Sequence, residues 1–411
     1  MYNFFIILFV KLVQFASLFH TKARLMCQGQ RQTAELLRRA NLSGQRCIWF
    51  HAASLGEFEQ GRPLIEKIKA QDPQCKILLT FFSPSGYEVR KNYPLADVVC
   101  YLPFDTRRRV REFLDLAQPS VAIFIKYEFW ANYLFELKRR EIPTYIISAI
   151  FRPEQPFFRW YGAPFRALLH CYTHLYIQDD ASRQLLEKAG IQGNVTVTGD
   201  TRYDRVWEIR RAAKEIPEVE SLLQAADGER VRTLVAGSSW PQDEEILIPY
   251  FNARPELKLI IAPHEIHEEH LRSIEAMLKR PALRLSAARG KDLRDYSCLI
   301  IDCFGLLSSV YRYGEIAYIG GGFGVGIHNT LEAAVYDIPV IFGPEYRKFR
   351  EACDLVECGG GFAVHSQSEF TAKMDELLSM PDHLRAAGKA SGALVRQNIG
   401  ATEKILEGLP L

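Results

Sequence analysis

The sequence predicts an α/β protein made of two doubly wound domains, each with a mainly parallel sheet. Short apolar runs alternate with amphipathic stretches along most of the chain, which is typical of parallel strands covered by helices on both faces. A length of 411 residues exceeds one comfortable hydrophobic core and favours two domains. In the second half, a glycine-rich loop separates a short apolar run from a helix start, an arrangement typical of phosphate-binding α/β domains.

The first domain is predicted over 46–203. Its pattern begins near Arg46 and ends near Gly199, and it indicates early helices over 61–70 and 86–92. The strands are expected at 47–50, 76–82, 98–101, 121–125, 144–148 and 174–177.

A polar stretch over 204–229 has helical character without a strand pattern and is predicted to be the linker. The second domain is predicted over 230–411, with a last helix that can return to the first domain. Two such domains are expected to leave a cleft at the carboxyl ends of their strands, where folds of this class bind ligands. The strands of the second domain are expected at 232–237, 257–262, 298–301, 316–319 and 338–342.

The first 24 residues are predicted to be a membrane-anchor segment. The run from Met1 to Phe19 is strongly apolar, but Lys11 interrupts it, and the pattern fits neither a full span of about 20 residues nor a cleavable signal. Basic residues follow the run, which favours a helix held on an anionic cytoplasmic surface, either lying on the membrane or crossing it. The alternative is a buried first helix of the fold. The basic residues are Lys22, Arg24, Arg31, Arg38, Arg39 and Arg46.

Charge and cysteine content exclude two classes of function. The formal net charge is +2, too small for a general nucleic-acid binder. The nine cysteines form no C-x-x-C pair, so neither a zinc motif nor a redox motif is indicated, and reduced thiols in a cytosolic setting are expected.

The glycine-rich loop at Gly320, Gly321 and Gly322 is predicted to hold a phosphate. It lies between an apolar run and a helix expected over 329–336, so backbone N–H groups and a helix N-terminus would surround one point. No Gly-Lys-Ser or Gly-Lys-Thr follows, and the glycines miss the dinucleotide spacing, which excludes a P-loop and disfavours a nicotinamide cofactor. The alternative is a cluster of glycines that only forms tight turns.

Asn329 and Glu332 shift the interpretation toward a sugar nucleotide. A carboxylate in the first helical turn can accept hydrogen bonds from a ribose diol while the backbone holds the phosphate. The sequence therefore favours a mononucleotide sugar as the ligand of the second domain.

Glu57 is the candidate catalytic residue of the first domain. It follows the first predicted strand in a loop of small residues, near the start of the next helix, where a carboxylate can act as a general base. A glutamate at a helix start is also a common capping group. His51, in the same loop, is expected to be a structural donor rather than a nucleophile or metal ligand.

These motifs, taken together, resemble the 3-deoxy-D-manno-octulosonic acid (Kdo) transferases of Gram-negative bacteria. The resemblance runs nearly end to end and is specific through the order and spacing of its motifs. The motifs are the apolar N-terminus, His51-Ala52-Ala53-Ser54-Leu55-Gly56-Glu57, Tyr127-Glu128-Phe129-Trp130-Ala131-Asn132, Gly199-Asp200-Thr201-Arg202-Tyr203-Asp204, Ala236-Gly237-Ser238-Ser239, Ala262-Pro263-His264, and Gly320-Gly321-Gly322 through His328-Asn329-x-Leu331-Glu332.

The resemblance implies a GT-B fold, with two Rossmann-like domains facing across a cleft and an N-terminal membrane-anchor helix. It implies transfer of Kdo from CMP-Kdo to the lipid A precursor, lipid IVA, in lipopolysaccharide biosynthesis at the cytoplasmic face of the inner membrane. Glu57 matches the family's general base, which deprotonates the acceptor hydroxyl as it attacks the anomeric carbon with inversion.

The resemblance also carries over a donor site. The predicted phosphate loop combines Gly320, Gly321 and Gly322 with Ser238 and Ser239. The CMP contacts fall on Pro263, His264, Phe304, Gly305, Leu306, Asn329, Thr330, Leu331 and Glu332.

Two positions depart from the family pattern. The family commonly has Gly-Glu where this chain has Gly305-Leu306, which removes a side-chain contact to the nucleotide. It has Pro-Arg where this chain has Pro263-His264, which replaces a permanent cation by a group that titrates near neutrality.

An acceptor site for an anionic lipid is expected around four charged residues of the first domain, each of which is otherwise an ordinary surface charge. They are Lys126, Glu128, Arg152 and Arg159.

No cofactor and no metal ion are expected. The chain has no Asp-x-Asp stretch, and a departing CMP phosphate is a good leaving group. Three alternatives stay open: another membrane-peripheral glycosyltransferase using a UDP-sugar, a non-hydrolysing sugar-nucleotide epimerase, and a nucleotide-binding or scaffold protein without catalysis.

Overall fold

The computed structural model describes residues 2–224 and 231–410, so residues 225–229 of the predicted linker and the first residue of the predicted second domain lie outside the described residues. The chain packs as two units. Unit 1 comprises the residues up to Arg205 together with those from Ile399 onward, and unit 2 comprises Val206–Asn398.

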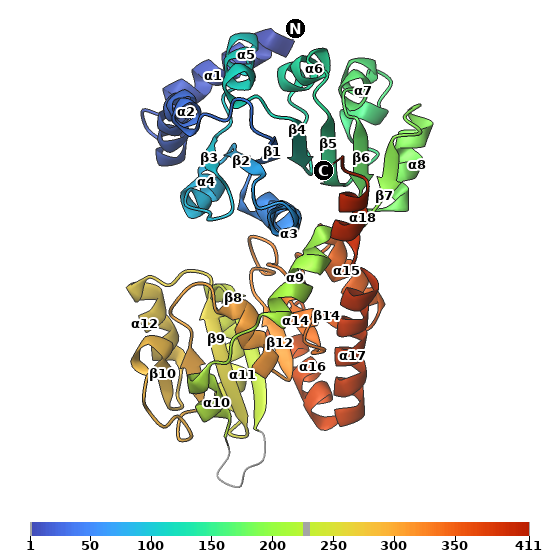
Figure 1. Ribbon diagram of the computed structural model, residues 1–411. Helices are drawn as coiled ribbons and strands as arrows, with labels where there is room; N and C mark the ends of the chain where they lie inside the picture. Colours follow the sequence, from blue (N-terminus) through green and yellow to red (C-terminus); the bar gives the residue numbers. More distant parts are fainter. Residues whose placement is uncertain (1, 225–230, 411) are drawn as a thin grey trace. The chain divides into compact units, whose positions relative to one another are not determined.

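Unit 1 contains a seven-stranded sheet whose paired strands are all parallel, in the order β3-β2-β1-β4-β5-β6-β7 (Figure 1). The order reverses between β1 and β4, so the loops that follow these two neighbouring strands leave the same edge side by side. The strands are β1 (Cys47–Ala52), β2 (Lys76–Phe81), β3 (Val98–Tyr101), β4 (Val121–Ile125), β5 (Thr144–Ala149), β6 (His174–Ile177) and β7 (Val195–Val197).

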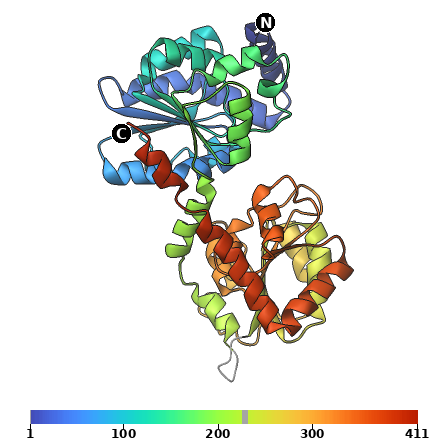
Figure 2. The same cartoon turned by 90° about the vertical axis from the view of Figure 1, so that its right-hand side faces the viewer.

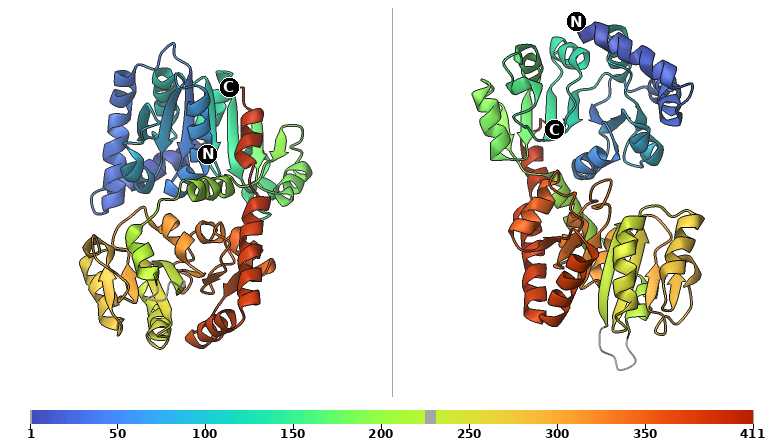
Figure 3. Two further views of the ribbon diagram at one scale, coloured as in Figure 1. Left: turned by 60° about the horizontal axis from the view of Figure 1, so that its bottom comes forward. Right: turned by 180° about the vertical axis from the view of Figure 1, so that it is seen from behind.

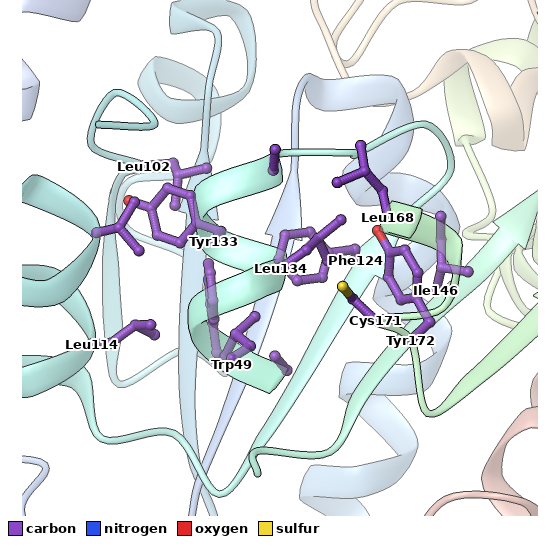
Figure 4. Close-up of a cluster of buried hydrophobic side chains, with 14 of the residues drawn as sticks. Trp49, Leu102, Leu114, Phe124, Tyr133, Leu134, Ile146, Leu168, Cys171 and Tyr172 are labelled. Carbon is purple, nitrogen blue, oxygen red and sulfur yellow. The ribbon is translucent and has the colours of Figure 1, made fainter. Parts of the chain in front are cut away.

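Helices cover both faces of this sheet. One apolar core includes Trp49, Phe124 and Tyr133 and lies beneath α2, α5, α6, α7 and α8 (Figure 4). The other core includes Phe58 of α3 and Ile405 of α18, so the last helix completes unit 1. The helices are α3 (Leu55–Gln71), α4 (Pro84–Arg90), α5 (Arg107–Ala117), α6 (Ala131–Arg139), η1 (Pro156–Phe158), α7 (Ala163–Leu169), α8 (Asp180–Lys188) and α18 (Ala401–Glu407).

Two N-terminal helices, α1 (Tyr2–Ala16) and α2 (Thr21–Ala40), pack on the β3 side of unit 1 (Figures 1 and 3). Thr33 of α2 donates its hydroxyl to the Tyr101 carbonyl at 2.8 Å, which satisfies a backbone group of this edge strand. Among the described residues, no single helix has the length and apolarity to cross a membrane; α1 and α2, bent by 116° at their break, meet that test only as a pair.

Unit 2 contains a second seven-stranded parallel sheet, in the order β10-β11-β9-β8-β12-β13-β14, which reverses between β8 and β12. Its strands are β8 (Arg232–Ser239), β9 (Leu257–Pro263), β10 (Ala282–Arg284), β11 (Cys298–Ile300), β12 (Ile316–Ile319), β13 (Val340–Phe342) and β14 (Gly361–Ala363).

Helices α11, α12 and α16 cover one face of this second sheet with a continuous apolar core. The long α17 packs against α14, α15 and α16 and then leads to α18 (Figure 2). Helix α9 (Thr201–Arg211) runs across the boundary between unit 1 and unit 2 in the chain. The other helices are α10 (Pro217–Leu223), α11 (Pro241–Asn252), α12 (Glu268–Met277), η2 (Leu285–Ala287), α13 (Leu307–Val310), η3 (Tyr311–Tyr313), α14 (Leu331–Ala334), α15 (Arg350–Glu357), α16 (Gln367–Ser379) and α17 (Pro381–Gln397).

The predicted α/β class with two doubly wound parallel sheets is confirmed. The sequence pattern missed β7, β10 and β14, which are three edge strands of three residues each. Most of their residues are only partly buried, so they lack the continuous apolar run that marks a central parallel strand.

Candidate functional site

In unit 1, the candidate residues gather where β1 and β4 end. Glu57 follows β1, and Lys126 and Glu128 follow β4, the strand paired with β1. This is the point at which the strand order reverses, where doubly wound sheets bind their ligands.

Glu57 lies in the first turn of α3 and closes a capping box. Its Oε2 accepts the backbone N–H of Ser54 at 2.9 Å and the Ser54 hydroxyl at 3.3 Å. Burial, and next the nearby Glu128 carboxylate, raise the pKa of Glu57 above its ordinary value, although the Ser54 N–H bond and Lys126 act in the opposite direction. Both bonds use Oε2, so Oε1 is the oxygen that can take a proton from a ligand. The capping role and a role as base are therefore compatible.

Glu128 is fixed beside Glu57 by a buried network. Its Oε2 lies 2.9 Å from His51 Nε2 and accepts the indole N–H of Trp130 at 2.5 Å. On its other side, His51 Nδ1 lies 2.9 Å from the Thr80 hydroxyl oxygen, which also accepts the indole N–H of Trp49 at 2.8 Å. His51, which was expected to be a structural donor, thus contacts a second carboxylate, that of Glu128, and holds it in position.

The other acceptor candidates lie in the loops that follow β4 and β5. Lys126 has a left-handed backbone, with φ of 72°, and places its ammonium 5.4 Å from the centre of the Tyr127 ring. Arg152 lowers the pKa of Tyr127, which burial raises, whereas the exposed Arg159 contacts the backbone of Glu154 in its own loop. Arg152 and Glu57 therefore both lie close enough to Tyr127 to act on its pKa.

In unit 2, the glycine-rich loop packs against neighbouring backbone. A Cβ on Gly320 would lie 2.2 Å from the Ser238 carbonyl oxygen, and a Cβ on Gly322 would lie 2.6 Å from the Gly343 Cα. These glycines are thus required by close approaches between the loops after β8, β12 and β13.

Two N–H groups of the predicted phosphate loop are already bonded within the protein. Gly320 donates to the Gly237 carbonyl at 2.9 Å, and Gly321 donates to Asp243 Oδ2 at 2.8 Å. Asp243 is fully buried and also accepts the Tyr318 hydroxyl at 2.7 Å, and burial raises its pKa. A phosphate bound at this loop would therefore depend on other donors than these two.

A stack of three rings joins the loops after β8, β9 and β12. The ring of His264 lies 4.7 Å from Trp240 and 4.4 Å from His328, nearly parallel to both. The Trp240 indole N–H donates to His328 Nε2 at 3.2 Å, which places the remaining proton of a neutral His328 on Nδ1. Burial, and next His264, lower the pKa of His328 to about 4.

The remaining donor candidates form a second linked group. Glu332 accepts hydrogen bonds from the Ser308 hydroxyl and from the Asn329 amide, the latter at 3.1 Å, so the turn at Phe304–Leu306 and the Asn329–Glu332 segment lie together. Phe304 is 77% exposed, and Gly305 has φ of 87° with open space around its Cβ position. The structure thus links the motifs that follow β11 and β12.

Several donor candidates have buried side chains. Thr330 and Leu331 are fully buried, and Pro263 is the buried last residue of β9. Ser239 is also buried and donates its hydroxyl to Glu244 at 2.9 Å, whereas Ser238 is partly exposed with φ of 53°.

The helix expected over 329–336 is much shorter than predicted. Helix α14 covers only Leu331–Ala334, so its dipole offers little to a phosphate. The sequence analysis also missed Trp240 and Asp243, although an acidic residue three positions after a helix start is a capping signal. Within 2–224 and 231–410, no group of three or more His, Cys, Asp or Glu side chains is arranged to hold a metal ion.

Comparison with known proteins finds sequence similarity to the 3-deoxy-D-manno-octulosonic acid transferases. The sequence profile described as 3-Deoxy-D-manno-octulosonic-acid transferase (kdotransferase) matches residues 22–205. The chain is 26% identical over 352 residues to a 3-deoxy-D-manno-octulosonic acid transferase of Aquifex aeolicus, covering 84% of this chain and 89% of that relative. It is 28% identical over 377 residues to the transferase of Rickettsia conorii, covering 88% of this chain and 78% of that relative.

Solved structures support the fold alone. The chain superposes on the UDP-GlcNAc 2-epimerase of Neisseria meningitidis with a TM-score of 0.61 and 14% identity, covering 88% of this chain and 98% of that one. A putative UDP-N-acetylglucosamine 2-epimerase of Listeria monocytogenes gives a TM-score of 0.58 and 12% identity, covering 88% and 95% of the two chains.

Proposed function

This chain belongs to the 3-deoxy-D-manno-octulosonic acid (Kdo) transferase family and is a glycosyltransferase, and from this membership we propose that it transfers Kdo from CMP-Kdo to the lipid A precursor lipid IVA. The observation that carries the proposal is the half-buried Glu57 beside Glu128, at the edge where β1 and β4 end. Such a carboxylate holds a proton more strongly than an exposed one and is suited to general-base work near neutral pH.

Glu57 would act as the base. The acceptor hydroxyl attacks the anomeric carbon of Kdo, its proton passes to Glu57 Oε1, and the bond between that carbon and the CMP phosphate oxygen breaks. Attack opposite the leaving group inverts the configuration. The Ser54 N–H bond to Oε2 fixes the carboxylate throughout the step, so little reorganisation is needed in the transition state.

Unit 2 would bind the donor. The linked loops with His264, His328 and Glu332 offer ring faces, an imidazole N–H and a carboxylate. These groups suit, in turn, the nucleobase, the phosphate and the ribose diol of a nucleotide. The cation that the family pattern supplies after Pro263 is replaced by His264, so phosphate binding would depend on imidazole and backbone donors.

The N-terminal helices would hold the enzyme at the cytoplasmic face of the inner membrane. Helix α1 exposes Phe4, Phe5 and Phe15 by 61–68%, and basic residues of α2 follow it in the chain. An apolar helix face next to cations is the pattern of an interfacial helix on anionic lipid.

The test is a transfer assay with the purified full chain. The protein is incubated with lipid IVA and with CMP-Kdo generated in situ, and the product is weighed by mass spectrometry. A mass increase by one or more Kdo units is expected. Unchanged lipid IVA, with the donor consumed only by hydrolysis, would refute the proposal.

The nucleotide is tested separately by thermal denaturation. CMP should raise the melting temperature, whereas UDP and UMP should not. Stabilisation by UDP alone would favour a UDP-sugar transferase, and nucleotide binding without any transfer would favour a protein without catalysis.

A further inference from the structure

A groove of about 560 Å³ in unit 1 lies outside the site described above. Segments of α1, α2 and α5 line it together with the loop after β3, which contributes Phe104. Its volume falls within the range of roughly 300–1,000 Å³ that is typical of ligand pockets. Because the groove opens beside the exposed apolar end of α1, where Leu18 is 64% exposed, it adjoins the surface proposed to contact lipid.

The polar side chains of the groove suit an anion. Arg31 of α2 and Arg109 of α5 line it, and Arg109 donates to Gln30 Oε1 at 3.4 Å. Gln30 Nε2 is buried and has no hydrogen-bond partner in the described part of the chain, so one donor in this lining is unused. The acidic residue of the lining, Glu112, pairs with Arg38 at 3.4 Å.

The apolar side chains suit an acyl chain. Leu37 and Phe113 form a buried floor, and Leu18 and Leu116 belong to the same lining. A lining with two guanidinium groups above an apolar floor matches a phosphate next to hydrocarbon, which is the chemistry of an acylated, phosphorylated glycolipid.

An aromatic path connects the groove to the candidate catalytic carboxylates. The ring of Phe104 lies 6.5 Å from that of Phe82, which lies 4.9 Å from that of Trp130. Trp130 then donates its indole N–H to Glu128, beside Glu57. Phe9 of α1 contacts both Phe82 and Phe104, at 6.4 and 6.1 Å, so α1 forms part of this path.

We propose that the groove between α1, α2 and α5 is a subsite for one phosphate and the adjoining acyl carbons of the acceptor lipid, with the path Phe104–Phe82–Trp130 leading from it to Glu57. The inference rests on the proposed function for the identity of the acceptor. It assigns α1 a second role, because the helix then shapes the acceptor site as well as attaching the protein to lipid.

The experiment compares two double variants on the same helices. R31A/R109A removes the two cations of the groove, and R39A/R108A removes one cation from each of α2 and α5 outside the lining. Binding of lipid IVA in neutral-detergent micelles is measured by tryptophan fluorescence, which needs no turnover. A third variant, A34W, fills the groove, because Ala34 belongs to its lining.

R31A/R109A should weaken binding of lipid IVA about tenfold or more, since charge-assisted hydrogen bonds to phosphate are lost, while R39A/R108A should bind nearly as the wild type does. The affinity for phosphatidylglycerol vesicles should fall by the same factor in the two double variants. A34W should weaken binding of lipid IVA but not of its deacylated form. CMP-induced thermal stabilisation, retained in all variants, shows that they fold.

Equal effects of the two doubles on lipid IVA would overturn the subsite, because the arginines would then act only as general surface charge. Unchanged lipid IVA binding in A34W would also overturn it. If the wild type transfers Kdo but the groove variants bind lipid IVA as well as the wild type does, only the subsite is refuted. If binding of lipid IVA depends on the groove but the wild type transfers no Kdo, only the proposed function is refuted.

Discussion

At the scale of single residues, the carboxylates of Glu57 and Glu128 form the proposed chemical centre of unit 1. Glu57 is placed by the capping box of α3, and Glu128 is placed by His51 and Trp130. Burial, and next the neighbouring Glu128 carboxylate, raise the pKa of Glu57, so this carboxylate holds a proton more strongly than an exposed one. The pair can be tested one member at a time.

The first prediction separates the proposed role of Glu57 as general base from its role as a helix cap. Glu57→Gln keeps an oxygen that can accept the Ser54 N–H, so the free energy of unfolding should change little. It cannot take a proton, so kcat should fall about 10²- to 10⁴-fold in the transfer assay. Glu57→Ala should lose activity as well and about 1 kcal/mol of stability, because the cap is removed.

Glu66→Gln, on the same helix and paired with Arg62, serves as the matched control and should retain activity. Full transfer by the Glu57→Gln enzyme would remove this residue from the role of base and leave it a helix cap.

The second prediction concerns the pH profile of kcat/KM. The base works when ionised, so activity rises as pH increases through the pKa of Glu57. Glu128→Gln removes a negative neighbour, lowers that pKa and should move the acidic limb to lower pH. Lys126→Met removes a positive neighbour and should move the limb to higher pH; His51 is the third titratable group that acts on Glu57.

Shifts in opposite directions are the discriminating result. If both variants moved the limb in the same direction, or neither moved it, the acidic limb would report a group other than Glu57.

At the scale of elements, the glycine-rich loop packs against neighbouring backbone and is also the segment proposed to bind a phosphate. Its glycines allow the loops after β8, β12 and β13 to approach within van der Waals distance, and Asp243 of α11 fixes Gly321. The loop thereby orders the segment that carries His328 and Glu332. Sequence reasoning correctly placed it between a strand and a helix start, but could not know which N–H groups the fold itself would use.

The third prediction tests this packing role. Gly322→Ala places a Cβ 2.6 Å from the Gly343 backbone, which must shift, so the free energy of unfolding should fall by about 1–3 kcal/mol. Gly324→Ala, two residues further on, meets nothing within 4 Å and should be nearly neutral. Urea denaturation of both variants measures the difference, and equal stabilities would show that the loop tolerates the displacement.

At the scale of the whole molecule, the two units divide the proposed chemistry. Unit 1 contains the proposed base, the helices proposed to contact lipid and the returning α18, and unit 2 contains the ring stack and the linked loops proposed for the donor. In unit 1, Glu57, Lys126 and Glu128 lie where the strand order of the sheet reverses, and in unit 2 the donor candidates lie after β8, β9, β11 and β12, which include the reversal between β8 and β12.

The fourth prediction concerns metal dependence of the complete reaction. CMP is a good leaving group, and imidazole and backbone donors of unit 2 are proposed to stabilise its developing charge. Transfer should therefore continue at the full rate in EDTA. A marked loss of product in the chelator, restored by magnesium, would show instead that a divalent ion carries this charge.

The sequence by itself determined the α/β class, the two parallel sheets and the similarity to the Kdo transferases, because continuous apolar strands, loop glycines and the order of motifs can be read directly along the chain. It could not determine the edge strands β7, β10 and β14, whose partly exposed residues carry no strong pattern. Nor could it show that His51 holds Glu128, that Trp240, His264 and His328 stack, or that α1, α2 and α5 enclose a groove. Those residues are far apart along the chain, and only the packing of the sheets and their helices brings them into contact.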